Sequence, residues 1–133
     1  MSASDDLEIL ARTVHGEARG ETFDGALAVA WVVVNRVRQK IRGESVRECC
    51  LAPAQFSCWL AGDPNLRVIA TASVDSDPSF MRSKAAAAAA LSHALPDPTG
   101  QATDYHALEI TPDWAKDYTL TARIGSHQFY RRS

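Results

Sequence analysis

Glu17 is the residue in this chain best placed to act as a proton donor. It lies in the segment HGEARGE, where Gly16 and Gly20 bracket it, so that backbone and a ligand can come close to its side chain. Apolar residues before it repeat at helical spacing. At about 100° per residue, Glu17 falls within about 20° of Leu10 on that apolar face. The pattern therefore predicts a carboxyl group that points toward the core or a cleft.

Partial burial would suit that carboxyl group to acid catalysis. Burial disfavours the ionised form and raises a carboxyl pKa, which is what a general acid needs. The competing interpretation is a glutamate at a helix end that bends back to solvent or forms a salt bridge with Arg12 or Arg19. The residue pattern alone leaves both open.

Glycosidic cleavage needs a proton donor and a way to stabilise an oxocarbenium-like centre. Most glycosidases supply a second carboxylate, and the candidates here are Glu21, Asp24, Asp104 and Glu109. None has a spacing that singles it out. The sequence is also compatible with a scheme in which one carboxyl group serves and the substrate supplies the nucleophile.

Zinc hydrolysis is the alternative chemistry. His15, His106 and His127 could supply three ligands of an open catalytic site. The chain has no HExxH motif, however, and single histidines are more often structural residues. Nucleophilic catalysis by Cys58 or Ser57 is disfavoured because neither lies in a recognisable motif. We therefore expect no metal and no cofactor.

The sequence predicts two helices on either side of Glu17. The first is capped by Ser4 and should run to about His15 and stop at Gly16. The second, capped by Thr22 or Asp24, should continue to about Lys40, and its apolar middle ALAVAWVVV predicts a buried central helix. Asn35 on that helix must find hydrogen-bond partners, and the backbone of the Glu17 turn is one candidate.

Further elements follow from capping and turn signals. Ser45 and Glu48 form a capping box for a short helix through Leu51. Asp-Pro pairs at 63–64 and 77–78 each open a helix, the second over about 78–94 with an alanine run that suggests close packing. Residues 101–110 and 119–131 alternate as strands do, with a break at Gly125-Ser126. The fold class is mainly α (α+β), with a small antiparallel β element near the C-terminus.

Composition suits one globular domain over residues 1–133. The net charge of -2 and a pI near 6.0 argue against a nucleic-acid binder with a broad basic face. No apolar run is long enough to insert into a membrane. The N-terminal MSASDDLEIL has no features of a signal peptide. Cys49, Cys50 and Cys58 are expected to be buried thiols, although a disulfide from Cys58 to either of the others is open.

Four ordered segments carry a resemblance to a known family. They are ARTVHGEARGETFDGALAVAWVVVNRV, SVRECCLAPAQFSCW, DPTGQATDYH and IGSHQFYR. Together they resemble the SleB-type cell wall hydrolases, the spore-cortex-lytic enzyme family. The resemblance spans nearly the whole chain, apart from the middle around residues 62–95. It implies a compact lysozyme-like domain that acts on peptidoglycan glycan strands.

The resemblance also implies roles for particular residues. Glu17 would protonate the oxygen between N-acetylmuramic acid and N-acetylglucosamine and then serve as base in a lytic transglycosylase reaction. The substrate groove would be lined by Gln55, Phe56, Ser57, Tyr105 and His106. The site would be supported from behind by Asn35, His127 and Phe129. From its residues alone, the QFSCW segment suits a sugar-binding wall and a loop tucked into the core equally well.

Two features of the sequence depart from the family's pattern. Gln101 stands in the DPTGQAT loop where relatives commonly have glycine, which could alter substrate preference. A catalytic domain without an export signal resembles an endolysin that is made in the cytoplasm and reaches the wall from a phage, a prophage or a phage-like particle.

We expect a monomer. The other hypotheses are an N-acetylmuramoyl-L-alanine amidase or peptidase, with zinc as its optional metal, and a non-catalytic wall-binding phage structural protein.

Overall fold

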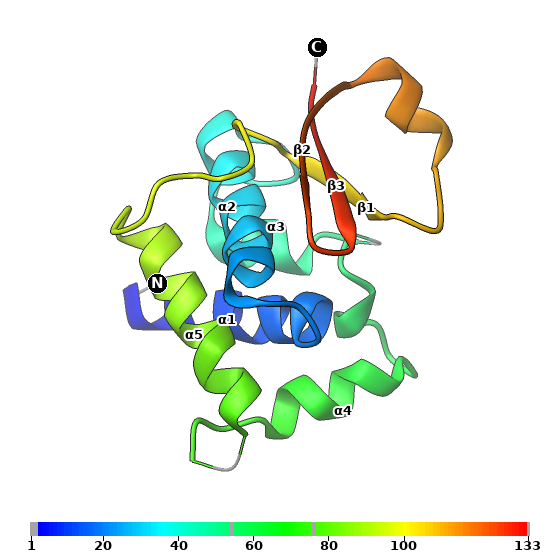
Figure 1. The fold of residues 1–133 in the computed structure, drawn as a ribbon. Coiled ribbons are helices and arrows are strands. Elements are labelled where there is room, and N and C mark those ends of the chain that lie inside the picture. The colour runs from blue at the N-terminus through cyan, green and yellow to red at the C-terminus, as the bar shows by residue number, and fades with distance from the viewer. Residues whose placement is uncertain (1–2, 54, 76, 133) are drawn as a thin grey trace.

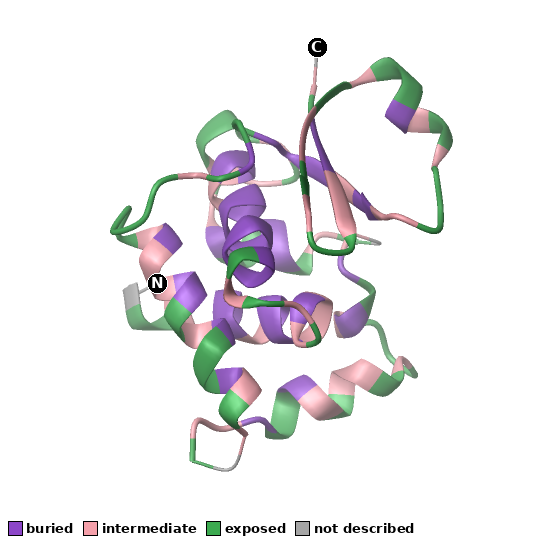
Figure 2. Ribbon diagram, in the orientation of Figure 1, coloured by how far each residue is buried: buried purple, intermediate pink, exposed green. Residues whose placement is uncertain are grey.

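Helix α2, Phe23–Gln39, is the central element in the computed structural model, which describes residues 3–53, 55–75 and 77–132. Every residue from Gly25 to Val33 is buried. A helix that is apolar all round must be covered on all sides. Figures 1 and 2 show other helices around α2 and a small sheet beside it. The predicted buried central helix is confirmed.

Among the described residues, four other α-helices pack on α2 or on one another, and three of them begin after the predicted caps; the first begins at Ala3, so Ser4 lies inside it and is not its N-cap as predicted. The four are α1 (Ala3–Ala18), α3 (Val46–Leu51), α4 (Pro64–Thr71) and α5 (Pro78–Leu91). The side chain of Ser45 accepts a hydrogen bond from the Glu48 backbone N–H at 3.1 Å, as the capping box requires. The connections hold two short 3₁₀ helices, η1 (Ser57–Trp59) and η2 (Asp113–Asp117).

Helix α1 does not stop at Gly16 as expected but continues through Glu17 to Ala18. Glycine costs a helix only about 1 kcal/mol relative to alanine, and packing easily offsets that. Here a Cβ on Gly16 would lie 2.6 Å from the Cβ of Cys58, so the glycine lets η1 approach the last turn of α1. Close packing, not a helix stop, is the reason for glycine at this position.

The alanine run forms a close contact between helices. Ala86, Ala87 and Ala90 are fully buried where α5 packs against α1 and α2, whereas Ala85 is exposed. Small side chains let helix backbones come near one another, and the predicted packing role is confirmed. Helix α5 ends at Leu91, three residues before the expected end.

The C-terminal third forms a three-stranded antiparallel sheet in the order β1-β3-β2. Its strands are β1 (Asp104–Ala107), β2 (Thr119–Ile124) and β3 (His127–Arg131). The predicted break at Gly125-Ser126 is the turn between β2 and β3. Phe129 packs with Ala28 and Val32 of α2, which fixes the sheet on the central helix. None of the described helices is long and apolar enough to cross a membrane.

Candidate active site

Glu17 lies in the last turn of α1, with its carboxyl group facing strand β1. The phenol of Tyr105 donates a 2.7 Å hydrogen bond to Glu17 Oε1. Neither arginine considered as a partner takes this carboxylate, because Arg12 pairs with Glu8 at 2.6 Å and Arg19 donates to Asn65 Oδ1 at 2.5 Å. The Glu17 side chain therefore belongs to a junction between the helices and the sheet.

The surroundings of Glu17 favour its protonated form. Burial raises the pKa of the carboxyl group above its usual value, and the hydrogen bonds from Tyr105 and Cys58 partly oppose this rise. Asp63 adds to the rise through like charge, while Arg36 works against it. A carboxyl group that keeps its proton at a higher pH than usual can serve as a general acid.

Two side chains that keep their protons lie beside Glu17. Burial, with the neighbouring Glu17 charge, raises the pKa of Tyr105 well above its usual value, so its phenol stays a donor. The same two causes raise the pKa of Cys58 to about 12, so its thiol also keeps its proton. All three cysteines are buried and free in the structure. Cys58 is thus a protonated neighbour of Glu17, a role that sequence reasoning did not assign.

Residues from the hairpin support Tyr105. The ring of His127 meets the Tyr105 ring edge-on at 5.1 Å between centroids, and Phe129 packs on it at 5.5 Å. His127 Nδ1 lies 3.6 Å from Glu21 Oε1, which also accepts a 2.8 Å hydrogen bond from the Ser126 backbone N–H. The structure thus places His127 and Phe129 behind the tyrosine.

Asn35 does not bond the backbone near Glu17, contrary to the sequence expectation. Its amide nitrogen donates to Asp97 Oδ2 at 3.0 Å and to the Ala102 carbonyl at 2.9 Å. Asp97 in turn accepts from the Thr99 backbone N–H at 2.8 Å. Asn35 therefore holds the loop that leads into β1 and acts on the position of Tyr105 only through that loop.

The residues expected along the substrate groove separate into two groups. Gln55 and Tyr105 line one pocket, and Ser57 is exposed nearby in sequence at the start of η1. Phe56 is buried, with the guanidinium of Arg36 over its ring, so it presents no open face to a sugar. The QFSCW segment therefore contributes Gln55 to the wall of a pocket, whereas Phe56 and Cys58 are buried in the core.

His106 lies on the opposite face of β1 from Tyr105, because side chains alternate along a strand. Its Nε2 is 2.8 Å from the Tyr130 hydroxyl and its Nδ1 is 2.7 Å from the Ala107 carbonyl. Both ring nitrogens are engaged, and the ring is buried. His106 is placed as a structural residue of the sheet and does not lie beside Glu17.

The histidines do not assemble a metal site in the described residues. His15 Nε2 lies 3.2 Å from Asp77 Oδ2, while His106 and His127 have the separate partners given above. No group of three His, Cys, Asp or Glu side chains with metal-binding geometry occurs in residues 3–53, 55–75 and 77–132. The donor set that zinc hydrolysis requires is not gathered there.

Other carboxylates near the site are engaged elsewhere. Asp63, whose charge acts on Glu17, accepts a 2.8 Å hydrogen bond from the Asn65 backbone N–H as the N-cap of α4. Glu21 bonds the turn of the hairpin. Both carboxylate oxygens of Asp104 accept hydrogen bonds of 3.1 to 3.3 Å from Nε and Nη2 of Arg132. Asp104 Oδ1 also lies 4.0 Å from Arg36 Nη2. These contacts leave Glu17 as the carboxyl group with both a raised pKa and a place in the junction.

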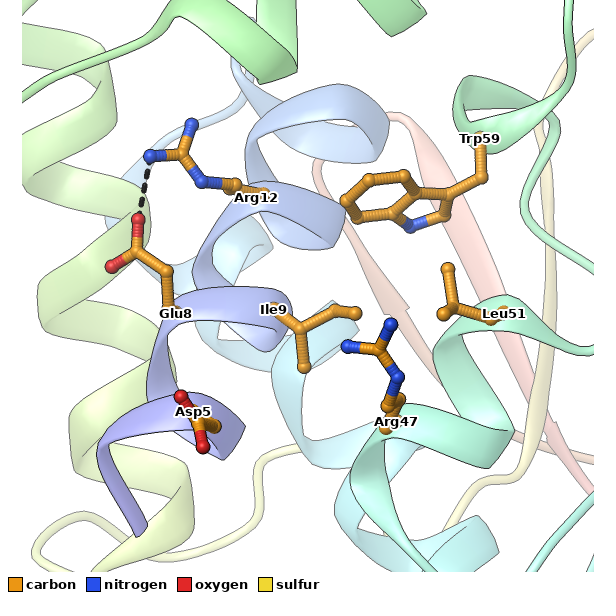
Figure 3. Close-up of a pocket in the computed structure, with 7 residues that line it drawn as sticks. All are labelled: Asp5, Glu8, Ile9, Arg12, Arg47, Leu51 and Trp59. Carbon is orange, nitrogen blue, oxygen red and sulfur yellow. Dashed lines mark ion pairs between the residues drawn. The ribbon is translucent and has the colours of Figure 1, made fainter. Parts of the chain in front are cut away.

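A separate hollow of about 650 Å³ lies between the first half of α1 and α3 (Figure 3). Figure 3 shows Glu8 paired with Arg12 on one side and Trp59 opposite. Glu17 is not among its lining residues. The larger hollow is therefore not the site of the proposed acid.

Several residues of the site carried no clear sequence signal. Arg36 follows a long apolar run and resembles the point where a helix reaches the surface, yet it is buried. Trp114 and Tyr118 lie in the loop between β1 and β2, far from Glu17 in sequence. Their spacing of four residues could have suggested that the two rings share one surface. It could not have predicted which other residues line the same pocket.

The fold and site define a mainly helical domain with a small sheet and a partly buried glutamate with a raised pKa at their junction. The chain belongs to the Cell Wall Hydrolase family, whose model matches residues 20–130 and so begins just after Glu17. The spore cortex-lytic enzyme of Halalkalibacterium halodurans is 31% identical over 130 residues, which cover 96% of this chain and 35% of that protein. The spore cortex-lytic enzyme of Bacillus cereus is 30% identical over 96% of this chain and 44% of its own length.

Solved structures agree with this assignment. The catalytic domain of the Bacillus cereus SleB protein superposes with a TM-score of 0.78 at 26% identity, covering 98% of this chain and 93% of that one. The catalytic domain of the germination-specific lytic transglycosylase SleB of Bacillus anthracis gives 0.75 at 26% identity, covering 98% and 97%. The predicted family and fold class are confirmed. The chain spans less than half the length of the curated relatives it matches.

Proposed function

We propose that this protein cleaves peptidoglycan glycan strands between N-acetylmuramic acid and N-acetylglucosamine as a lytic transglycosylase. The observation that carries the proposal is the Glu17 carboxyl group, whose pKa is raised by burial and whose Oε1 is fixed by Tyr105. The similarity to spore cortex-lytic enzymes and to a lytic transglycosylase domain supports the same substrate class.

Glu17 can perform both proton transfers of such a reaction. In the first step its protonated carboxyl group gives a proton to the glycosidic oxygen, the bond from that oxygen to C1 of the muramoyl unit breaks, and C1 becomes oxocarbenium-like. In the second step the Glu17 carboxylate takes the proton of the muramoyl 6-hydroxyl, whose oxygen bonds to C1. The product is a 1,6-anhydro ring, Glu17 regains its proton and no water is consumed.

The engagement of the other carboxylates favours this route over hydrolysis. An inverting or retaining hydrolase needs a second carboxylate as base or nucleophile. Glu21 is held by the hairpin turn and Asp104 by Arg132. A substrate hydroxyl that replaces water removes the need for either one.

Mass spectrometry of soluble products from purified peptidoglycan tests the proposal. Wild type should release anhydro-muropeptides, which are lighter than reducing muropeptides by one water and resist borohydride. Glu17→Gln should lower the release by about 10²- to 10⁴-fold, the usual contribution of general acid–base catalysis. Glu44→Gln is the matched control, because Glu44 is a surface residue near Lys40 that lies outside the site.

Other products would contradict the proposal in different ways. Reducing muropeptides would mean that water attacks C1 and that a second group activates it. Free stem peptides with intact glycan would indicate an amidase or peptidase. Wall binding without soluble fragments would indicate a non-catalytic wall-binding protein.

A further inference from the structure

A pocket of about 430 Å³ lies beside Glu17 and shares Tyr105 with it. Its other walls bring together charged and aromatic side chains from α2, the loop after it, the η2 loop and the strands. Those used below are Arg36, Arg42, Asp104, Trp114, Tyr118 and Arg132. We refer to this set as the arginine pocket.

The arginine pocket holds more positive than negative charge. Three guanidinium groups face one carboxylate, that of Asp104, which leaves a formal excess of two positive charges. Arg132 already binds Asp104 with two nitrogens at 3.1 to 3.3 Å. Arg42 is exposed and has no ion-pair partner within the described part of the chain. The pocket is therefore suited to an anion supplied from outside.

Arg36 gives this surplus charge a fixed position. Its side chain is only 7% exposed, its Nε donates to the Thr103 carbonyl at 2.6 Å, and its guanidinium lies over Phe56. Its Nη1 has no hydrogen-bond acceptor among the described residues. Nη1 itself is shielded, so Arg36 contributes fixed positive charge at the wall of the pocket, and a carboxylate is the anion that guanidinium groups bind best.

The aromatic walls add a preference for a sugar-linked anion. Trp114 and Tyr118 lie 5.5 Å apart between ring centroids at an interplanar angle of 35°. The Arg132 guanidinium lies over the Tyr118 ring at 5.4 Å. Aromatic faces pack against the apolar faces of sugars and acyl groups, whereas guanidinium groups bind carboxylates.

We propose that the arginine pocket binds a carboxylate carried by the muramoyl unit of the substrate. This inference rests on the proposed function, because the pocket would position the glycan whose bond Glu17 cleaves. Two sources share this chemistry. One is the lactyl carboxylate of a muramoyl unit without a peptide, and the other is a carboxylate of the acidic stem peptide.

The test measures binding without cleavage. Glu17→Gln protein is titrated with purified peptidoglycan carrying its stem peptides, and with the same material after its carboxylates are capped as neutral amides. The same pair of ligands is prepared from glycan stripped of its peptides by an amidase, once with the freed lactyl carboxylate intact and once with it capped as a neutral amide. Arg42→Gln is added to the Glu17→Gln background, with Arg67→Gln as control because Arg67 is an exposed arginine on α4.

Capping should weaken binding of the Glu17→Gln protein to at least one of the two materials about tenfold, which corresponds to about 1.4 kcal/mol. The double variant Glu17→Gln with Arg42→Gln should bind the uncapped ligand about tenfold more weakly than Glu17→Gln alone. Capping should then no longer change its affinity. Arg67→Gln should change neither. A capping effect confined to the stripped glycan assigns the lactyl carboxylate, and one confined to the peptide-bearing material assigns the stem peptide; either result supports the proposal.

The proposal is overturned if capping leaves the affinity for both the peptide-bearing and the stripped material unchanged, or if Arg42→Gln and Arg67→Gln weaken binding equally. It is also overturned if Arg42→Gln stays as sensitive to capping as its parent. These results are separate from the fate of the proposed function, which is decided by the products of the wild-type protein. A protein that releases anhydro-muropeptides but ignores capping keeps its function and lacks this subsite.

Discussion

Tyr105 donates a hydrogen bond of 2.7 Å to Glu17 across a sequence separation of 88 residues. This contact joins the end of α1 to the first strand of the sheet. It orients the carboxyl group while opposing part of the pKa rise that burial causes. The site is therefore a product of the contact between the helices and the sheet.

Tyr105→Phe should raise the pKa of Glu17 further, because it removes a hydrogen bond that lowers it. The alkaline limb of the pH–rate profile should move to higher pH, while the maximum rate falls as the carboxyl group loses its fixed orientation. Muropeptide release measured across pH tests this. A lower rate with an unmoved alkaline limb would show that the phenol has only a packing role.

Glu21→Gln should retain activity within a few-fold, because its amide oxygen can still accept from the Ser126 backbone N–H. Glu21→Ala should lower the free energy of unfolding by about 1 kcal/mol through the lost hydrogen bond and should reduce activity by loosening His127. Denaturant unfolding and muropeptide release measure the two effects. A Glu21→Gln variant as inactive as Glu17→Gln would instead identify Glu21 as a second catalytic carboxylate.

Gly16→Ala should destabilise the protein by about 1–3 kcal/mol, the usual cost of overpacking. The added Cβ would meet Cys58 Cβ at 2.6 Å and Sγ at 2.7 Å, so Cys58 would have to leave its place beside Glu17. Gly20→Ala is the matched control, because nothing lies within 4 Å of a Cβ there. Thermal unfolding of both variants tests this, and equal stabilities would contradict the close contact between Gly16 and η1.

His15 should make the protein less stable as the pH falls below about 6.5, the unperturbed histidine pKa. Burial lowers the pKa of His15, more than Asp77 raises it. The unfolded chain therefore binds a proton at a pH where folded His15 stays neutral, and stability is lost as the pH falls from about 6.5 through the folded pKa. Above about 6.5 this contribution is fully present.

The measurement is the drop in Tm between about pH 7.5 and about pH 5.5 for wild type and His15→Gln. The variant should show a smaller drop, whatever its absolute stability. Part of the dependence should remain, because burial also lowers the pKa of His127. Identical drops in the two proteins would contradict a neutral buried His15.

Local signals in the sequence were sufficient to predict where the main helices and strands lie. Side-chain capping at Thr22 and Ser45 starts two helices, and the apolar middle of α2 predicts its burial. These features depend on residues a few positions apart, so the chain carries them without its fold. The boundary at Gly16 was wrong because a glycine that ends a helix and a glycine that admits a neighbour look alike in sequence.

The sequence by itself determined the helical architecture, the C-terminal sheet and the prominence of Glu17, because periodicity, capping and one motif are local properties. Delivery by a phage-like particle and a monomeric state stay predictions from the sequence. Only the tertiary structure decided that Tyr105 holds Glu17, that Cys58 lies beside it, that Phe56 and His106 are buried, and that Arg36 lines a charged pocket. Burial, pKa and charge balance depend on residues brought together from distant segments, and no spacing along the chain contains that information.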